Sequence, residues 1–111
     1  MSDCLFCRIA AGELPAKIVH QDDRYVAFED IHPQAPVHLL IIPRRHVDGL
    51  ASLADDDSNL AGGVITLARK LAVERGLDGR GYRLVANQGA EAGQTVFHLH
   101  FHLLGGRALS W

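Results

Sequence analysis

The feature that most constrains this chain is the segment of residues 98–104, in which imidazole and apolar side chains alternate. In a β-strand, successive side chains point to opposite faces of the sheet. The alternation therefore predicts a strand over residues 96–104 whose apolar face packs on the core. The other face carries imidazoles at intervals of about 6.5 to 7 Å, from His98, His100 and His102.

Such a row is costly to bury without a purpose, because neighbouring imidazoles repel one another when protonated. We therefore expect a functional site, for which two kinds of chemistry are open. Three histidines can hold a catalytic metal, although rings spread along one strand converge on a single ion with difficulty. Alternatively, neutral imidazole is a nucleophile near pH 7, and protonated imidazole stabilises phosphate oxygens. Phosphate is favoured by the upstream loop, whose glycines let the backbone approach an anion: Asn87, Gly89, Gly93, Gln94 and Thr95.

The first half of the chain predicts a short helix and three strands. We expect the helix over residues 4–11, with Asp3 as its N-cap. Two strands, over residues 17–21 and 25–30, form a hairpin. The nearly unbroken apolar run 37–42 predicts a central strand buried on both faces. His38 is its one polar interruption and needs a partner.

The second half predicts one long helix, over residues 55–75, and two strands, over residues 82–87 and 96–104. The helix has an apolar face at spacings of 4, 3 and 4, formed by Leu60, Val64, Leu67 and Leu71. Its acidic start suits the helix dipole and is interpreted as a turn in solvent. Because too few helices separate the strands for a parallel sheet, we predict an α+β fold with an antiparallel five-stranded sheet.

The 111 residues allow a single domain, 1–111, because two domains would each be too small to bury a useful core. The net charge of −2 argues against nucleic acid or an anionic membrane as a partner. No apolar run is long enough to span a bilayer. The opening Met1-Ser2-Asp3-Cys4 lacks a basic region followed by an apolar stretch, so we expect no secretory signal and a cytoplasmic protein.

Motifs along nearly the whole chain resemble the histidine-triad (HIT) superfamily, and within it the histidine triad nucleotide-binding (Hint) branch. Residues 98–104 match the family pattern His-φ-His-φ-His-φ-φ, where φ is apolar. The other matching motifs are Asp22-Asp23-Arg24, Ala27-Phe28, Asp30-Ile31, Pro33-Gln34-Ala35-Pro36, His38, Ile42-Pro43, Gly93-Gln94 and Leu104-Gly105-Gly106-Arg107. The resemblance implies the HIT-like fold and a homodimer in which the two sheets join.

The resemblance also implies an enzyme that binds purine mononucleotides such as AMP. Hint-like proteins hydrolyse nucleoside 5′-phosphoramidates to a nucleoside monophosphate and an amine. A dinucleoside polyphosphate hydrolase of the other main branch is the alternative, although the Leu104-Gly105-Gly106-Arg107 ending favours the Hint branch. A nucleotide-binding regulatory protein with incidental catalysis is a further alternative.

The same resemblance implies a role for each site residue. His100 is the nucleophile that attacks the α-phosphorus and forms a nucleotidyl-histidine, which water then hydrolyses. His102 and His38 contact the phosphate oxygens, and Thr95 stands near the leaving group, where the family usually has a serine. The implied nucleotide contacts are a phosphate cradle of Asn87, Gly93, Gln94, Thr95 and Val96, the ribose acceptor Asp30, and the base contacts Phe6, Ile9, Phe28 and Ile31.

A second motif, Cys4-x-x-Cys7, lies at the start of the predicted short helix. Residues three apart share a helix face, so the two thiols form half of a tetrahedral zinc site. His46 and His98 are candidates for the other two ligands, and resemblance to the zinc-bearing subset of the superfamily implies a structural Zn²⁺ on these four residues. The alternative is a pair of reduced, partly buried thiols.

Overall fold

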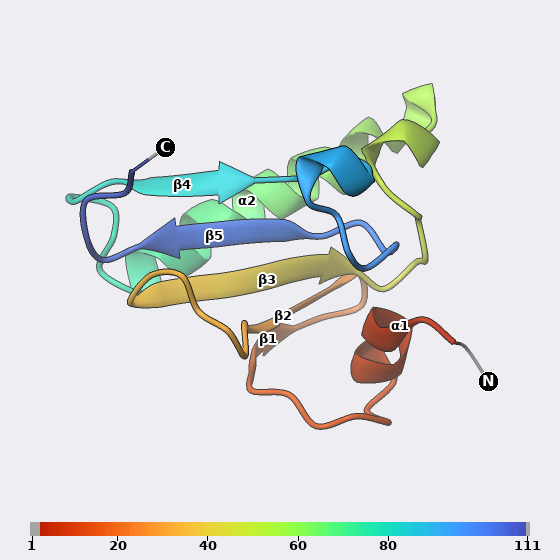
Figure 1. Ribbon diagram of the computed structural model, residues 1–111, viewed down its shortest axis with the longest axis horizontal. Helices are drawn as coiled ribbons and strands as arrows, with labels where there is room; N and C mark the ends of the chain where they lie inside the picture. The colour runs from red at the N-terminus through yellow and green to blue at the C-terminus, as the bar shows by residue number, and fades with distance from the viewer. Residues whose placement is uncertain (1–2, 111) are drawn as a thin grey trace.

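The computed structural model describes residues 3–110, in which the strands form one antiparallel five-stranded sheet of order β1-β2-β3-β5-β4. The strands are β1 (Ile18–Gln21), β2 (Tyr25–Glu29), β3 (Val37–Pro43), β4 (Tyr82–Val85) and β5 (Phe101–Gly105). Met1-Ser2, part of the opening segment from which we expect no secretory signal, lies outside the described residues. The α+β fold with an antiparallel five-stranded sheet is confirmed (Figure 1).

Two α-helices, α1 (Leu5–Ala10) and α2 (Ser58–Glu74), cover opposite faces of the sheet. Alternate residues of β3 show this arrangement. Leu39 and Ile41 pack in the large core beneath α2, whereas Leu40 and Ile42 pack in a smaller cluster with α1. β3 is therefore buried on both faces, as its apolar run predicts.

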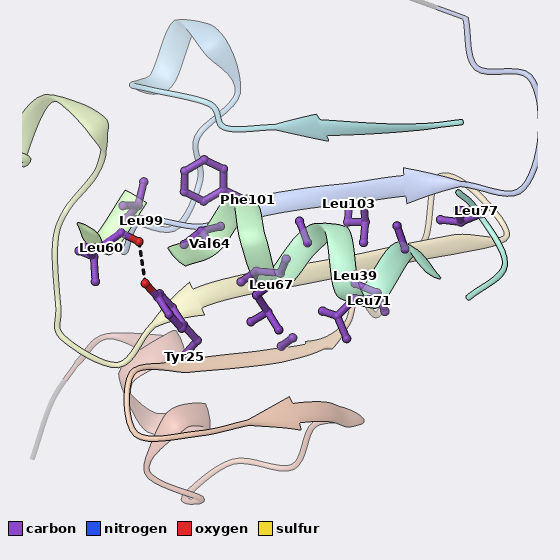
Figure 2. Packing of buried hydrophobic residues seen from close by; sticks show 14 of the residues in the cluster. Tyr25, Leu39, Leu60, Val64, Leu67, Leu71, Leu77, Leu99, Phe101 and Leu103 are labelled. Carbon is purple, nitrogen blue, oxygen red and sulfur yellow. Dashed lines mark hydrogen bonds between the residues drawn. The ribbon is translucent and has the colours of Figure 1, made fainter. Parts of the chain in front are cut away.

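The large core lies between α2 and the middle of the sheet (Figure 2). Its helical side is the face with spacings of 4, 3 and 4, and all four of its residues are buried: Leu60, Val64, Leu67 and Leu71. On the sheet side, Leu99, Phe101 and Leu103 pack in the same cluster, so the apolar half of the histidine segment faces the core as predicted. The Tyr25 hydroxyl donates to the Leu60 carbonyl oxygen at 2.8 Å and joins the start of α2 to β2.

Several element boundaries differ from the prediction. The N-cap of α1 is Cys4, whose sulfur accepts a hydrogen bond from the Cys7 amide, so the assignment of Asp3 as the cap was wrong. A 3₁₀ turn over Asp55–Asp57 precedes α2. β4 ends at Val85 rather than at residue 87. None of the helices within residues 3–110 is long and apolar enough to cross a membrane.

The largest correction concerns β5, which begins at Phe101 rather than at residue 96. β4 ends at Val85, opposite His102, and the ladder with β3 ends at the Ile41–Phe101 pair although β3 itself continues to Pro43. Upstream, the Leu99 amide instead donates to the Val47 carbonyl oxygen at 2.6 Å. His98 and His100 therefore belong to a bent, irregular segment, and only His102 of the three lies on a strand.

Candidate functional site

Although only His102 lies on the strand, the histidine rings still gather on the α1 side of the sheet. The His100 and His102 ring centroids lie 5.2 Å apart, and the His38 ring on β3 lies 5.2 Å from His102. The Phe6 ring of α1 stands edge-on to His100 at 5.0 Å. His38, the polar interruption of the central strand, thus finds its partner in His102.

The protonation pattern of His100 follows from one hydrogen bond. Its Nδ1 lies 2.7 Å from the main-chain oxygen of His98, and a carbonyl oxygen can only accept. Nδ1 therefore carries the proton, and the lone pair of the neutral ring is on Nε2. His100 is 8% exposed and lines the cavity described below, so its uncommitted nitrogen is the one available to a ligand.

A chain of hydrogen bonds fixes the other two rings in the same way. The Gln34 amide donates to His38 Nδ1 at 3.0 Å, so the proton of neutral His38 lies on Nε2. That Nε2–H faces His102 Nδ1 at 2.9 Å and the Asp30 carboxylate at 3.4 Å. His102 Nδ1 consequently accepts, which leaves an N–H on His102 Nε2 as a hydrogen-bond donor.

Burial keeps these rings neutral. It lowers the pKa of His102 to about 4, with the neighbouring His100 and His38 rings lowering it further and Asp30 opposing them. Burial likewise lowers the pKa of His38, against the opposing charge of Asp30. At neutral pH His38 and His102 are therefore uncharged, and His102 presents an N–H to the cavity rather than a positive charge.

A cavity of about 400 Å³ opens beside the histidines, between α1, β2 and the segment that precedes β5. Most residues that the sequence assigns to nucleotide binding line it: Phe6, Ile9, Phe28, Asp30, Ile31, Thr95, Val96, His100 and His102. His38 does not line it and lies behind His102. Asn87, Gly93 and Gln94 also lie outside the lining, so the structure brings together the base, ribose and histidine positions more completely than the phosphate loop.

The side chains of the phosphate loop hold the loop itself. Gln94 is 4% exposed, and its amide nitrogen donates to the carbonyl oxygens of Asp48 at 2.8 Å and Val96 at 3.2 Å, while its oxygen accepts from the Gly89 amide. The Asn87 amide donates to the Ala92 oxygen at 2.8 Å. Gly93 has φ +92°, which disfavours other residues there. The Gln94 backbone N–H also donates within the loop, to the Gly89 oxygen at 3.0 Å, so neither amide group of Gln94 is directed at the cavity.

A second cluster of donor atoms lies near Phe6, whose ring centroid is 6.1 Å from that of His98. The ligand atoms of Cys4, Cys7, His46 and His98 all lie within 4.8 Å of one another. The Nδ1 of His98 is 3.2 Å from the Cys4 sulfur and 3.4 Å from the Cys7 sulfur, and the Nδ1 of His46 is 3.3 Å from the Cys7 sulfur. Two sulfur and two imidazole donors form a set that binds a tetrahedral metal ion.

The outer partners of these two histidines also suit a metal. His98 Nε2 donates to the Pro43 oxygen at 2.7 Å, and His46 Nε2 lies 2.7 Å from the Asp48 carboxylate. Each ring thereby points the lone pair of Nδ1 at the sulfurs. Burial lowers the pKa of His98, which favours the neutral ring that a metal needs. Asp48 is not among the residues predicted from the sequence, although an acid two residues after His46 was a signal for it.

A third set of donor atoms in the described part of the chain, on Asp30, His38 and His102, also lies close together. Its hydrogen bonds argue against a metal. His38 Nδ1 accepts from the Gln34 amide, so Nε2 holds the proton, and a metal there would have to displace it. This set is better described as a hydrogen-bonded relay within the histidine site.

Residues 11–109 match the family described as the HIT domain. The chain belongs to the HIT family. A HIT family hydrolase from Legionella pneumophila has a structure with a TM-score of 0.97 and 51% sequence identity, covering 98% of this chain and 97% of that one.

Other members of the HIT family are similar to this chain in sequence or in structure. The chain is 48% identical to an uncharacterized HIT-like protein of Synechocystis, over 98% of this chain and 95% of the relative. A histidine triad nucleotide-binding protein from Candida albicans has a TM-score of 0.84 and 32% identity, covering 98% of this chain and 82% of that one. The HIT match begins at residue 11 and leaves Cys4, Phe6 and Cys7 outside it.

Proposed function

We propose that this HIT protein is a purine nucleoside phosphoramidase that cleaves the phosphorus–nitrogen bond of nucleoside 5′-phosphoramidates. The observation that carries the proposal is His100: its Nδ1 is bonded to the His98 oxygen, and its Nε2 lone pair is available in a cavity with aromatic and acidic walls. Phe6 and Phe28, whose ring centroids are 5.5 Å apart, suit a base. Asp30 suits the ribose hydroxyls of an AMP-type substrate.

In the proposed reaction, a bond forms between His100 Nε2 and the α-phosphorus as the phosphorus–nitrogen bond of the substrate breaks, and the departing amine takes up a proton from solvent. The product is a nucleotidyl-histidine. Water then attacks the phosphorus, the phosphorus–Nε2 bond breaks and a proton of the water is released to solvent, which frees the nucleoside monophosphate and restores the Nε2 lone pair of His100. The N–H of His102 Nε2 is a donor to a phosphate oxygen, where charge grows in the transition state. His38 acts through His102, because it lies behind that ring, rather than by the direct contact that the sequence suggested.

The charge of the cavity favours a phosphoramidate over the alternative, a dinucleoside polyphosphate. No Lys or Arg among the described residues lines it, and two acids, Glu29 and Asp30, do. Since burial also keeps His102 neutral, the site offers hydrogen bonds rather than positive charge. A phosphoramidate monoester carries one negative charge at neutral pH, whereas the bridging phosphates of a polyphosphate carry several without a cation to compensate them.

Incubation with adenosine phosphoramidate and with a diadenosine polyphosphate tests the proposal. We expect AMP release from the first, and His100→Ala to lower turnover by at least about a thousandfold while AMP still binds. Hydrolysis of the polyphosphate alone would overturn the proposal. Binding without cleavage of either would favour the regulatory alternative.

We also propose that Cys4, Cys7, His46 and His98 hold a structural Zn²⁺, supported by the donor set and by the outer partners of both histidines. Such an ion joins α1 to the segment that carries His100. The side chain of His98 then binds the metal ion, while the main-chain oxygen of His98 accepts the hydrogen bond from His100 Nδ1. Reduced thiols suit a cytoplasmic protein. Metal analysis after purification without chelator is expected to give about one zinc per chain, and a value near zero would contradict the site.

The open edge of the sheet supports the proposal of a homodimer. In the described part of the chain β4 pairs with β5 on one side and with no strand on the other. An unpaired strand of this kind is a template for a second copy, which would extend the sheet across the pair. Light scattering on the eluting protein is expected to give twice the 12.1 kDa of the chain; a value of 12.1 kDa would contradict the dimer.

A further inference from the structure

A second hollow, of about 470 Å³, lies next to the nucleotide cavity. It is formed by the start of α1 and by the bent segment that leads to β5, two parts of the chain that are far apart in sequence. Its lining residues are Asp3, Cys4, Leu5, Thr95, Val96 and Phe97. The proposed phosphoramidase reaction assigns no role to Asp3, Leu5 or Phe97.

The hollow and the nucleotide cavity share three residues, Leu5, Thr95 and Val96. In an in-line displacement, the leaving group lies across the phosphorus from the attacking atom. His100 lines the nucleotide cavity but not the hollow. The hollow adjoins the cavity at the three shared residues, so it is available to a leaving group that lies away from His100.

The walls of the hollow indicate what it accepts. Leu5 and Phe97 are large apolar side chains that remain 46% and 54% exposed, so each still has apolar surface to bury against a ligand. Asp3 is the one charged residue among those that line the hollow in the described part of the chain. A carboxylate with no lining cation repels a negative group and attracts an ammonium group.

We propose that this hollow is the leaving-group subsite, and that it selects a neutral or cationic amine with an apolar body against an anionic one. The assignment rests on the proposed phosphoramidase function and names its substrate class more closely. Leu5 and Phe97 hold the apolar body of the amine, and Asp3 sets the preference for charge. These three are specificity residues rather than members of the catalytic histidine group.

The sharpest test is a matched pair of adenosine phosphoramidates whose amines end either in a carboxylate or in the isosteric carboxamide. We expect kcat/KM to be about tenfold higher for the carboxamide, as for two like charges near a protein surface. In Asp3→Asn protein, kcat/KM for the carboxamide is expected to exceed that for the carboxylate by no more than about twofold. The matched Asp78→Asn variant is expected to keep the tenfold difference of the wild type.

The apolar wall is tested with phenethylamine as the leaving group, against the unsubstituted phosphoramidate as reference. Phe97→Ala is expected to reduce the advantage of phenethylamine by about tenfold. Ile65→Ala is the control, because Ile65 is an exposed apolar residue of α2 that does not line the hollow. It is expected to leave the advantage of phenethylamine unchanged.

The outcomes separate the subsite from the proposed function. Cleavage of all these substrates at equal rates, or ratios that do not respond to Asp3→Asn and Phe97→Ala, would refute the subsite and leave the phosphoramidase intact. Calorimetric binding to His100→Ala protein gives the same comparison without turnover. If the wild type cleaves none of the phosphoramidates but His100→Ala protein shows the expected binding ratios, the subsite stands and the hydrolase does not. Absence of both cleavage and binding overturns both.

Discussion

Zinc binding is expected to stabilise the fold by an amount that a thermal scan measures directly. The four ligands come from three parts of the chain, and Cys4 and His98 are separated by 94 positions. In the folded protein their donor atoms lie within 4.8 Å of those of Cys7 and His46, whereas the unfolded chain offers no such site. Zinc therefore binds the native state preferentially, and its binding free energy adds to the free energy of unfolding.

The magnitude follows from linkage. At a free zinc concentration about a hundredfold above the dissociation constant, the added stability is about 2.7 kcal/mol. The unfolding entropy of a 111-residue domain is about 0.23 kcal/mol per kelvin near 60 °C. Zinc is therefore expected to raise the Tm by about 12 °C, measured by calorimetry on metal-free protein with and without buffered zinc.

Two variants make this prediction specific. Cys4→Ser/Cys7→Ser removes both sulfur ligands and is expected to abolish the zinc-dependent shift. Asp48→Asn keeps all four ligands but weakens the partner of His46 Nε2, so zinc affinity should fall by about tenfold or more in a chelator competition. A wild-type Tm that does not respond to zinc, or an equal response from the double variant, would refute the reasoning.

Three further predictions concern packing, the phosphate loop and pH. Gly63→Ala should destabilise the protein by about 1–3 kcal/mol in urea unfolding, because its Cβ would overlap the Tyr25 hydroxyl, whereas Gly62→Ala, with open space, should stabilise it by about 1 kcal/mol; equal effects would contradict the packing. Gln94→Glu should cost about 2 kcal/mol by removing the donors to two carbonyl oxygens, and the exposed Gln88→Glu, which keeps its acceptor for the Ala51 amide, should cost little. The folded-state pKa of His102 lies below its ordinary value, so the unfolded chain binds the proton first and stability is lost as pH falls from about 6.5 to about 4. From pH 7 to pH 4, the free energy of unfolding should fall by about 3 kcal/mol more in the wild type than in His102→Asn, and identical pH profiles would contradict the depressed pKa.

The sequence predicted correctly which side chains face the core. It predicted the ends of the strands less well. Alternation in residues 98–104 correctly placed Leu99, Phe101 and Leu103 in the core. The same alternation predicted a strand that begins five residues too early, at residue 96 instead of Phe101. Alternating side chains indicate an extended backbone, whether or not a neighbouring strand is present to pair with it. The ladder depends on partners: β4 ends opposite His102, and upstream of Phe101 the chain leaves β3, which continues to Pro43, as the Leu99 amide donates to the Val47 oxygen instead.

The same limit applies to the site. Spacing and residue type were enough to single out His100, His102, Cys4 and Cys7, since these residues carry their chemistry in the local sequence. The partners that set each ring are distant or belong to the backbone: the His98 oxygen for His100, the Gln34 amide for His38, and the Pro43 oxygen for His98. Backbone groups are the same in every residue, so no pattern of side chains indicates which of them will accept or donate.

The sequence by itself therefore determined the set of chemical groups and the two faces of each apolar element, because residue type and the spacing of apolar residues are local properties. Only the tertiary structure decided which nitrogen of each imidazole carries the proton and which histidines face the cavity. It also decided that Asp3 and Phe97, 94 positions apart in sequence, line one hollow. Those outcomes depend on contacts between segments far apart in the chain, which form when the two faces of the sheet are covered by α1 and α2.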